Sequence, residues 1–177
     1  MKYSVLEKNL MDQLESKIVD TTPGMMVRAY QGGRIVCDIR VGTTYAYYDF
    51  ASLTKIIFTV QAMMVSFEQG RWNLDSRVQE FLPWFSHAAV RVQDLLTHSS
   101  GLTWWAPFYK EIDLSLDINL RREKLREMIS KLEVSDTPNS VYSDVGFLLL
   151  GFLIEEFYQA KILDVWNGIK EKFYAGT

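Results

Sequence analysis

The sequence predicts an α+β fold in which a helical region accompanies an incomplete antiparallel sheet. Apolar residues recur at helical spacing in about six segments, whereas only two segments have the pattern of strands. The chain has 177 residues, of which 48% are hydrophobic and 23% charged, as in ordinary globular domains. This length allows one domain, or one domain with a short extension. We expect residues 1–51 to form the N-terminal helix and hairpin of an α/β part and residues 52–177 to form the helical part.

The first 51 residues begin with apolar residues at helical spacing. They predict an amphipathic helix over residues 6–18, which a Thr-Thr-Pro-Gly segment ends. Two strands over residues 25–30 and 34–41 follow, with Gly32 and Gly33 in the hairpin turn between them. A lone two-stranded hairpin is marginal in water, so partner strands are expected, and no later segment has a strand pattern. We therefore expect the return strands of the sheet to be absent from this chain.

From residue 52 onward the pattern is helical. Apolar residues over 53–67 follow the i, i+3, i+4, i+7 rule and the neighbouring flank is apolar too, which predicts a helix buried nearly all round. Gly70 is placed to end it. Further helical segments are expected around residues 92–96, 125–132, 145–158 and 162–173.

Composition and charge exclude several classes of function. The net charge is −3 and lysine and arginine form no cluster, so nucleic-acid binding is not expected. The longest apolar run, residues 145–154, is too short to span a bilayer. Cys37 is the only cysteine, and His87 and His98 lie in different segments, so we expect no disulfide framework, no metal site and no cofactor. Cys37 alternates with apolar neighbours and is expected to be a small core residue.

The N-terminal segment is polar and has no apolar h-region or small-residue cleavage site. This pattern predicts a cytoplasmic protein, or a periplasmic one if a leader was removed.

Ser52 and Lys55 stand three residues apart at the expected start of a helix, so their side chains lie on one face. The spacing suits nucleophilic catalysis, because the N–H groups and the positive dipole end at a helix N-terminus favour a developing oxyanion. The same positive end, together with burial, is expected to lower the pKa of Lys55 towards that of a working base. The alternative is that Ser52 caps the helix and Lys55 extends to solvent.

Other candidate site residues lie further along the chain. Tyr142 and Asp144 precede an apolar helix, where Tyr142 can shuttle a proton and Asp144 can contact substrate or Lys55. Alternatively, Tyr142 is a core residue and one of the next two residues caps the helix. His98 is expected to hold a loop by hydrogen bonds, since a catalytic role needs a serine and an acid nearby. Trp104 and Trp105 are either core and loop anchors or the lining of a substrate cleft.

Four stretches of the sequence agree in order and spacing with one known superfamily. They are Phe50-Ala51-Ser52-Leu53-Thr54-Lys55, Gly70-Arg71-Trp72-Asn73-Leu74-Asp75, Leu95-Leu96-Thr97-His98-Ser99-Ser100-Gly101-Leu102, and Tyr142-Ser143-Asp144-Val145-Gly146-Phe147 with Leu149-Leu150-Gly151. On these stretches the chain, from about residue 25 to residue 173, resembles the serine β-lactamase and penicillin-binding-protein superfamily. The likeness is closest to its branch of class C β-lactamases, D-alanyl-D-alanine carboxypeptidases and esterases.

The resemblance implies a mixed α/β domain beside an all-helical one, with the active site in the cleft between them. It implies that Ser52 is the acylated nucleophile, Lys55 the base and Tyr142 the relay that passes the proton to the leaving group. Asp144 stands where the family's second motif often has Asn, and its implied contact is with substrate or with Lys55. The family's third motif, Lys-Thr-Gly or His-x-Gly on a strand that supplies the second oxyanion N–H, lies downstream of everything in this sequence.

The function expected from the sequence is that of a serine hydrolase acting through an acyl-enzyme on a β-lactam, a D-amino-acid peptide or an ester. The alternative is a truncated, catalytically inactive remnant or a binding module that keeps the same scaffold. A small-molecule or peptide substrate is the expected partner. Since a hairpin exposes unpaired backbone at its edges, we also expect a second chain or self-association to complete the sheet.

Overall fold

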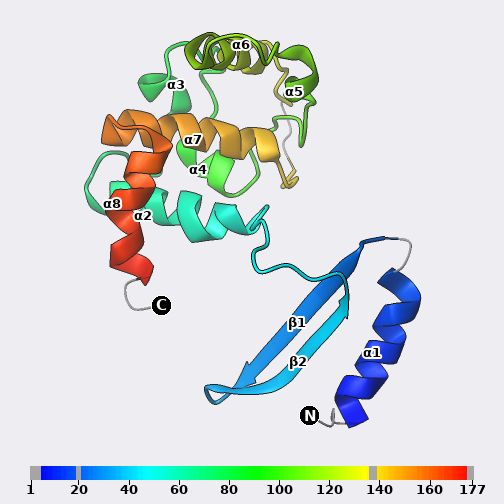
Figure 1. Ribbon diagram of the computed structural model, residues 1–177. Coiled ribbons are helices and arrows are strands. Elements are labelled where there is room, and N and C mark those ends of the chain that lie inside the picture. Colours follow the sequence, from blue (N-terminus) through cyan, green and yellow to red (C-terminus); the bar gives the residue numbers. More distant parts are fainter. Residues whose placement is uncertain (1–4, 19–20, 136–138, 175–177) are drawn as a thin grey trace. The chain divides into compact units, whose positions relative to one another are not determined.

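The computed structural model describes residues 5–18, 21–135 and 139–174. The chain divides into two compact units, Met1–Phe50 and Ala51–Thr177. Among the described residues, the first unit contains one helix and a two-stranded antiparallel sheet, and the regular elements of the second unit are helices (Figure 1). The α+β class predicted from the sequence is therefore confirmed.

An antiparallel hairpin forms the sheet of the first unit. Its strands are β1 (Gly24–Gln31) and β2 (Arg34–Gly42), each slightly longer than the sequence pattern predicts. The turn residues Gly32 and Gly33 have φ angles of 56° and 74°. Two successive residues with positive φ give the turn a twist that matches that of the flanking strands, and glycine adopts this conformation without steric cost.

Helix α1 (Val5–Ile18) packs against one face of the hairpin. The buried centre of this contact is Cys37, Ile39 and Val41 of β2, which point to one face because side chains alternate along a strand. The expectation that Cys37 is a small core residue is confirmed. The partly buried side chains packed against this centre are Leu10, Met11, Leu14, Met25 and Val27.

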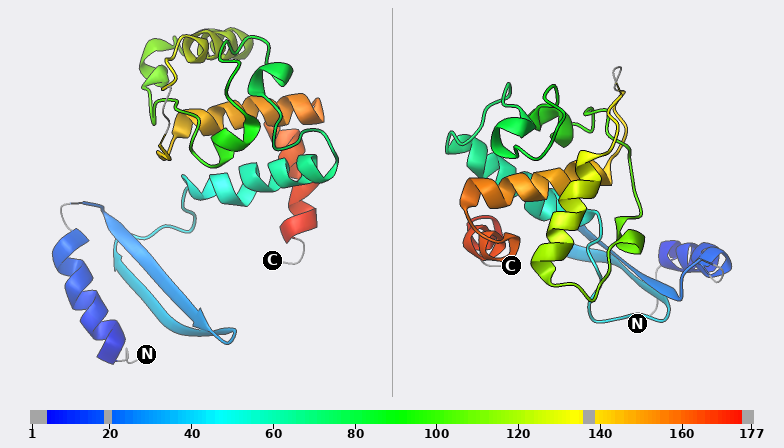
Figure 2. Two further views of the ribbon diagram at one scale, coloured as in Figure 1. Left: turned by 180° about the vertical axis from the view of Figure 1, so that it is seen from behind. Right: turned by 90° about the horizontal axis from the view of Figure 1, so that it is seen from above.

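The second unit is arranged around α7 (Asp144–Tyr158), which is the most apolar of its long helices. Figures 1 and 2 show α2 and α4 on one side of α7 and α6 on the other. The remaining helices of this unit are, in chain order, η1 (Lys55–Thr59), α2 (Val60–Glu68), α3 (Val78–Phe81), α4 (Val92–Leu96), α5 (Phe108–Glu111), α6 (Ile118–Ser130) and α8 (Ile162–Tyr174). The sequence pattern did not predict the short helices α3 and α5. Across the residues that the structure describes, no helix is long and apolar enough to cross a membrane.

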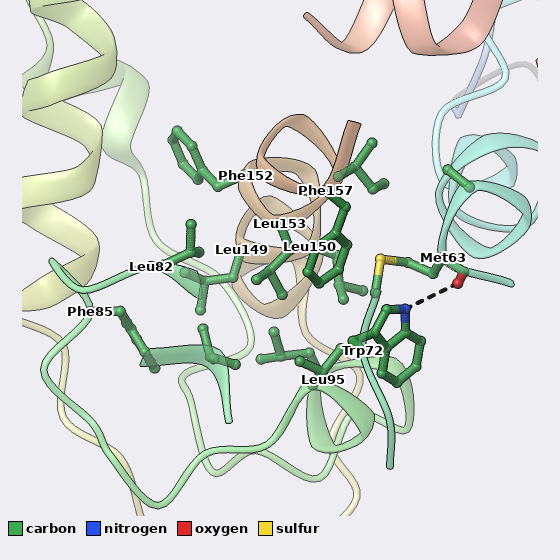
Figure 3. Close-up of a cluster of buried hydrophobic side chains, with 14 of the residues drawn as sticks. Met63, Trp72, Leu82, Phe85, Leu95, Leu149, Leu150, Phe152, Leu153 and Phe157 are labelled. Carbon is green, nitrogen blue, oxygen red and sulfur yellow. Dashed lines mark hydrogen bonds between the residues drawn. The ribbon is translucent and has the colours of Figure 1, made fainter. Parts of the chain in front are cut away.

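The core of the second unit lies between α7 and its neighbours (Figure 3). Leu149, Leu150 and Leu153 of α7 are fully buried in it. Trp72 joins the core from the loop after α2, and its indole N–H donates to the Met63 carbonyl at 3.2 Å and to the Ser66 hydroxyl at 2.9 Å. A buried indole N–H without a partner is costly, so these bonds fix how the loop returns to α2.

The helix expected over residues 53–67 differs from the prediction in two ways. Residues Lys55–Thr59 form the π-helix η1, and from Val60 onward the helix continues as the α-helix α2. It is also not buried all round, because the described residues of this unit cover only the side that carries Phe58, Ala62 and Met63. The apolar side chains that stay exposed are Leu53, Ile56, Met64 and Phe67.

Candidate active site

Ser52 lies in the turn that leads into η1. The Ser52 carbonyl accepts a hydrogen bond from the Lys55 N–H at 3.1 Å, and the Ala51 carbonyl accepts one from the Thr54 N–H at the same distance. Ala51 has a φ of 44°, a left-handed conformation that is strained for a residue with a Cβ atom. Ser52 is thus exposed at the amino end of a helix, directly after a strained residue, and such strain is often found at functional sites.

Lys55 is the first residue of η1 and contacts two other candidate residues. Its Nζ atom donates to Ser52 Oγ at 3.2 Å and to Asp144 Oδ1 at 2.6 Å. The first distance falls within the range of about 2.6–3.2 Å at which a nucleophile and its base can exchange a proton. The alternative in which Lys55 extends to solvent is wrong, since only 16% of its side chain is exposed.

Tyr142 reaches Ser52 from the segment that precedes α7. Its hydroxyl donates to Ser52 Oγ at 2.7 Å, and half of the residue is exposed, so the alternative of a core tyrosine is wrong. Ser143 is the N-cap of α7, because its Oγ accepts from the Gly146 N–H at 3.1 Å. With Ser143 as the cap, the residues on either side of it are free to serve the site: Tyr142 faces Ser52, and Asp144 faces Lys55.

The charges at the site shift two pKa values in opposite directions. Burial lowers the pKa of the Lys55 ammonium, but the hydrogen bond to Asp144 and the nearby Tyr142 phenol outweigh it, so the pKa is above its ordinary value. The lowered pKa expected for Lys55 is therefore wrong, because that expectation left out the carboxylate of Asp144. The Lys55 ammonium, and secondly the hydrogen bond with Ser52, lower the pKa of the Tyr142 phenol.

The two tryptophans differ in their relation to the site. Trp105 helps to line an open cavity of about 370 Å³ beside Lys55 and Asp144. The Trp104 side chain is not part of this lining; it is 60% exposed and stacks on Trp105 with ring centroids 5.9 Å apart. Trp104 instead contributes its backbone carbonyl, which accepts from the Asp144 N–H at 2.8 Å. The other residues that line the cavity are Ala51, Thr54, Thr59, Ala106, Phe108, Val145, Phe147 and Leu148.

Phe147 belongs to the site although the sequence reasoning did not single it out. Its ring lies 5.5 Å from Lys55 Nζ, within the range of a cation–π contact, and it lines the cavity. Phe147 follows Asp144 by three residues on α7, so the two side chains share one face of the helix. That spacing was visible in the sequence and could have identified Phe147 once Asp144 was placed in the site.

The two histidines bind backbone groups of the chain itself. The Nε2 atom of His87 lies 2.7 Å from the Leu132 carbonyl, and Nδ1 of His98 accepts from the Ser143 N–H at 3.0 Å. His98 therefore holds a loop by hydrogen bonding, as expected. Among residues 5–18, 21–135 and 139–174, no three histidine, cysteine or carboxylate side chains are grouped so as to hold a metal ion.

Known proteins are similar to this chain in sequence and in fold. The chain is 27% identical to an N-acetylmuramyl-L-alanine amidase of Bacillus subtilis (strain 168), in an alignment that covers 94% of this chain and 44% of the amidase. Among solved structures, a D-stereospecific amidohydrolase from a Streptomyces species superposes with a TM-score of 0.73 at 22% identity, over 94% of this chain and 54% of that one. A class C β-lactamase from Rhodobacter sphaeroides superposes with a TM-score of 0.64 at 21% identity, over 91% of this chain and 47% of that one.

These two structural likenesses show the β-lactamase/transpeptidase fold, and this chain spans about half the length of the proteins it matches. The family model named Beta-lactamase matches residues 11–164, which is most of the chain and includes the Ser52, Lys55, Tyr142 and Asp144 positions. The chain therefore belongs to the Beta-lactamase family.

Proposed function

We propose that this chain carries the nucleophile and proton-transfer groups of a serine hydrolase that forms an acyl-enzyme. The observation that carries the proposal is the convergence of two side chains on one atom: Lys55 Nζ and the Tyr142 hydroxyl both donate to Ser52 Oγ, at 3.2 Å and 2.7 Å. A nucleophile within hydrogen-bond reach of a proton acceptor, which is in turn held by a third group, is the general arrangement of covalent catalysis.

The directions of the pKa shifts support a specific division of labour. Lys55, whose pKa is raised, stays an ammonium held by Asp144, and its charge favours the phenolate form of Tyr142, whose pKa is lowered. In the proposed step, Ser52 Oγ forms a bond to the substrate carbonyl carbon while its proton moves to the phenolate oxygen of Tyr142. Tyr142 then gives that proton to the leaving-group atom as the bond to the acyl carbon breaks. This assignment gives Tyr142 the role of base that the resemblance implied for Lys55.

The substrate we propose is an amide whose leaving group is an amine nitrogen, either a β-lactam or a peptide that contains a D-amino acid. The cavity of about 370 Å³ beside Lys55 has room for a small acyl group, and Trp105 and Phe147 give it apolar walls. The names of the similar proteins support this class, since one is an amidase, one a D-stereospecific amidohydrolase and one a class C β-lactamase. Simple esters serve as the comparison with these amides in the labelling experiment described below.

A second candidate function is a binding module that keeps the scaffold without turnover. The exposure of the site favours it, because Tyr142 is 50% exposed and Asp144 45%, whereas hydrolase sites gain much of their electrostatic stabilisation by excluding water.

We also propose that a second chain or a second copy of this chain pairs with the hairpin. Within the described residues, β1 and β2 pair only with each other, so each strand has one open edge.

Intact-mass labelling of the 177-residue chain separates the two functions. A fluorophosphonate, a penicillin and an activated ester are each incubated with the chain, with its Ser52→Ala variant and with Ser115→Ala as a matched control at an exposed serine outside the site. The hydrolase proposal expects one adduct on the unmodified chain and on Ser115→Ala, and none on Ser52→Ala. Absence of any adduct on the unmodified chain, alone or mixed with candidate partner chains, supports the binding module instead.

A further inference from the structure

The segment that carries Tyr142 is attached to His98 at two points. The Val141 N–H donates to the His98 carbonyl at 2.9 Å, and the Ser143 N–H donates to the His98 ring atom Nδ1 at 3.0 Å. These two bonds lie on either side of Tyr142 in the sequence. A single residue therefore fixes the backbone before and after the side chain that contacts Ser52.

The imidazole ring of His98 also packs against Tyr142 directly. The two ring centroids are 4.7 Å apart, and the imidazole also stacks on Phe147 at 5.0 Å with an interplanar angle of 29°. Phe147 is anchored in α7, so the imidazole contacts both that helix and the tyrosine ring. The position of Tyr142 thus depends on the His98 side chain as well as on its backbone.

The backbone of His98 shows that histidine is costly at this position. Helix α4 ends in a Schellman motif, in which the His98 N–H donates to the Leu95 carbonyl and the Ser99 N–H donates to the Asp94 carbonyl, at 3.3 Å and 2.8 Å. In this motif the residue at His98 takes a left-handed conformation, here with a φ of 56°. Glycine, and sometimes asparagine, fills such a position with less strain. A strained histidine whose ring atom accepts a hydrogen bond points to a role beyond ending the helix.

We propose that His98 is a positioning residue whose neutral imidazole holds Tyr142 in contact with Ser52 and whose protonation releases Tyr142. The proposal rests on the proposed function, in which Tyr142 is the proton acceptor. Nδ1 accepts the Ser143 N–H only when it carries no proton, so the neutral tautomer has its hydrogen on Nε2. A proton on Nδ1 would place an N–H group of the ring against the Ser143 N–H. The hydrogen bond between them, one of the two attachments of this segment to His98, would then be lost.

The groups that face His98 set the pH at which this release occurs. Burial and the charge of Lys55, from η1, lower the pKa of His98, whereas the charge of Asp144, from α7, raises it. Among the residues that the structure describes, the Tyr142 phenol also contacts the ring. The net effect places the pKa below its ordinary value, so the imidazole is neutral at pH 7 and becomes charged as the pH falls through that lowered pKa.

Two substitutions at His98 separate the ring acceptor from the backbone conformation. His98→Asn tolerates the left-handed conformation and offers a side-chain oxygen to the Ser143 N–H, but it does not titrate. His98→Gly also tolerates that conformation and removes the acceptor. The unmodified 177-residue chain and both variants are followed by NMR, which reports the shift of the Ser143 amide and the pKa of the Tyr142 phenol. Circular dichroism checks that the variants are folded, and Ser52 labelling by a fluorophosphonate is timed for all three.

We expect the Tyr142 pKa to stay lowered in His98→Asn and to return towards that of free tyrosine in His98→Gly, with labelling slowed on the order of 10²-fold. In the unmodified chain the Ser143 amide shift should change as the pH falls through the pKa of His98, and in His98→Asn it should not. If His98→Gly keeps the lowered Tyr142 pKa, or if the unmodified chain and His98→Asn share one pH profile, the positioning role is wrong. If none of the three is labelled while the NMR pattern holds, the positioning role stands and the proposed acylation fails.

Discussion

The Lys55 Nζ atom and the Asp144 Oδ1 atom lie 2.6 Å apart, although the two residues are 89 positions apart in the sequence. The contact joins the first residue of η1 to the first residue of α7. Lys55 is largely shielded from solvent, whereas Asp144 is about half exposed, so the pair is weakened less by solvent than a fully exposed pair. The ion pair therefore ties together the two helices whose amino ends carry the candidate catalytic residues.

Replacing Asp144 by Asn should lower the pKa of Lys55. The amide keeps the shape of the side chain but removes the charge, while the burial that lowers the lysine pKa remains. Because the folded-state pKa of Lys55 is raised, the stabilisation from this pair is present below the ordinary lysine pKa and is lost as the pH rises through the folded-state value. NMR titration of Lys55 in the unmodified chain and in Asp144→Asn measures the shift.

Asp164→Asn, at an exposed position of α8, is the matched control and should leave Lys55 unchanged. An equal Lys55 pKa in the unmodified chain and in Asp144→Asn would show that the carboxylate is not the cause of the shift.

Replacing Tyr142 by Phe should strongly slow the reaction at Ser52 with little loss of stability. The change removes the hydroxyl that lies 2.7 Å from Ser52 Oγ and keeps the ring that packs against His98. A positioned proton-transfer group contributes about 10²–10⁴-fold in rate, and substitutions at exposed positions change the free energy of unfolding by about 0.5 kcal/mol or less. Fluorophosphonate labelling and thermal unfolding are compared with those of Tyr109→Phe, which changes an exposed tyrosine in α5. Undiminished labelling of Tyr142→Phe would remove Tyr142 from the mechanism.

Neighbouring leucines of α7 should differ widely in their effect on stability. Leu150 is fully buried in the core around α7, whereas Leu148 is 39% exposed. Leu150→Ala leaves a cavity and should lower the free energy of unfolding by about 2–5 kcal/mol. Leu148→Ala should lower it by about 1 kcal/mol or less. Denaturant unfolding measures both, and similar losses in the two variants would contradict the packing of α7.

The open edges of the hairpin should make the chain self-associate. Sedimentation at increasing concentration should show a mass above that of the 20.6 kDa monomer. Val36→Lys adds a charge to β2 at a position that is 51% exposed, and it should shift the chain towards the monomer. Leu163→Lys, at an exposed position of α8, is the control and should associate like the unmodified chain. A monomer at all concentrations would contradict association through the hairpin.

The spacing of residues predicted much of the fold and of the site. Alternation along two strands located the hairpin, and the three-residue spacing of Ser52 and Lys55 placed both side chains on one face. Such local patterns are visible because the repeat of a helix or a strand determines which side chains are neighbours. The contact between Tyr142 and Ser52 was predicted from the resemblance to a known family, because contacts between distant segments leave no periodic signal in one sequence.

The burial of the helix after Ser52 and the pKa of Lys55 could not be predicted in the same way. An apolar residue such as Met64 has the same pattern in the sequence whether or not a neighbour covers it. The Lys55 pKa depends on a balance between burial and the Asp144 charge, which is decided by a distance of 2.6 Å that no spacing fixes. The positioning role of His98 likewise depends on two hydrogen bonds to a segment more than forty residues away, which no local pattern in the sequence predicts.

The π-helical turn η1 determines how a change of chain length before α2 would act on the site. A π-turn is closed by i→i+5 hydrogen bonds, so it holds one more residue than the i→i+4 turn of an α-helix. Removing one residue between Lys55 and Thr59 would therefore let the helix continue in a regular α form and leave the residues on either side in nearly the same angular relation. A deletion within α2 has no extra residue to absorb it and would turn Ser52 and Lys55 by about 100° relative to the rest of that helix. A relative could therefore lose one residue at η1 and keep the site, whereas the same loss one turn later would separate Ser52 from Tyr142.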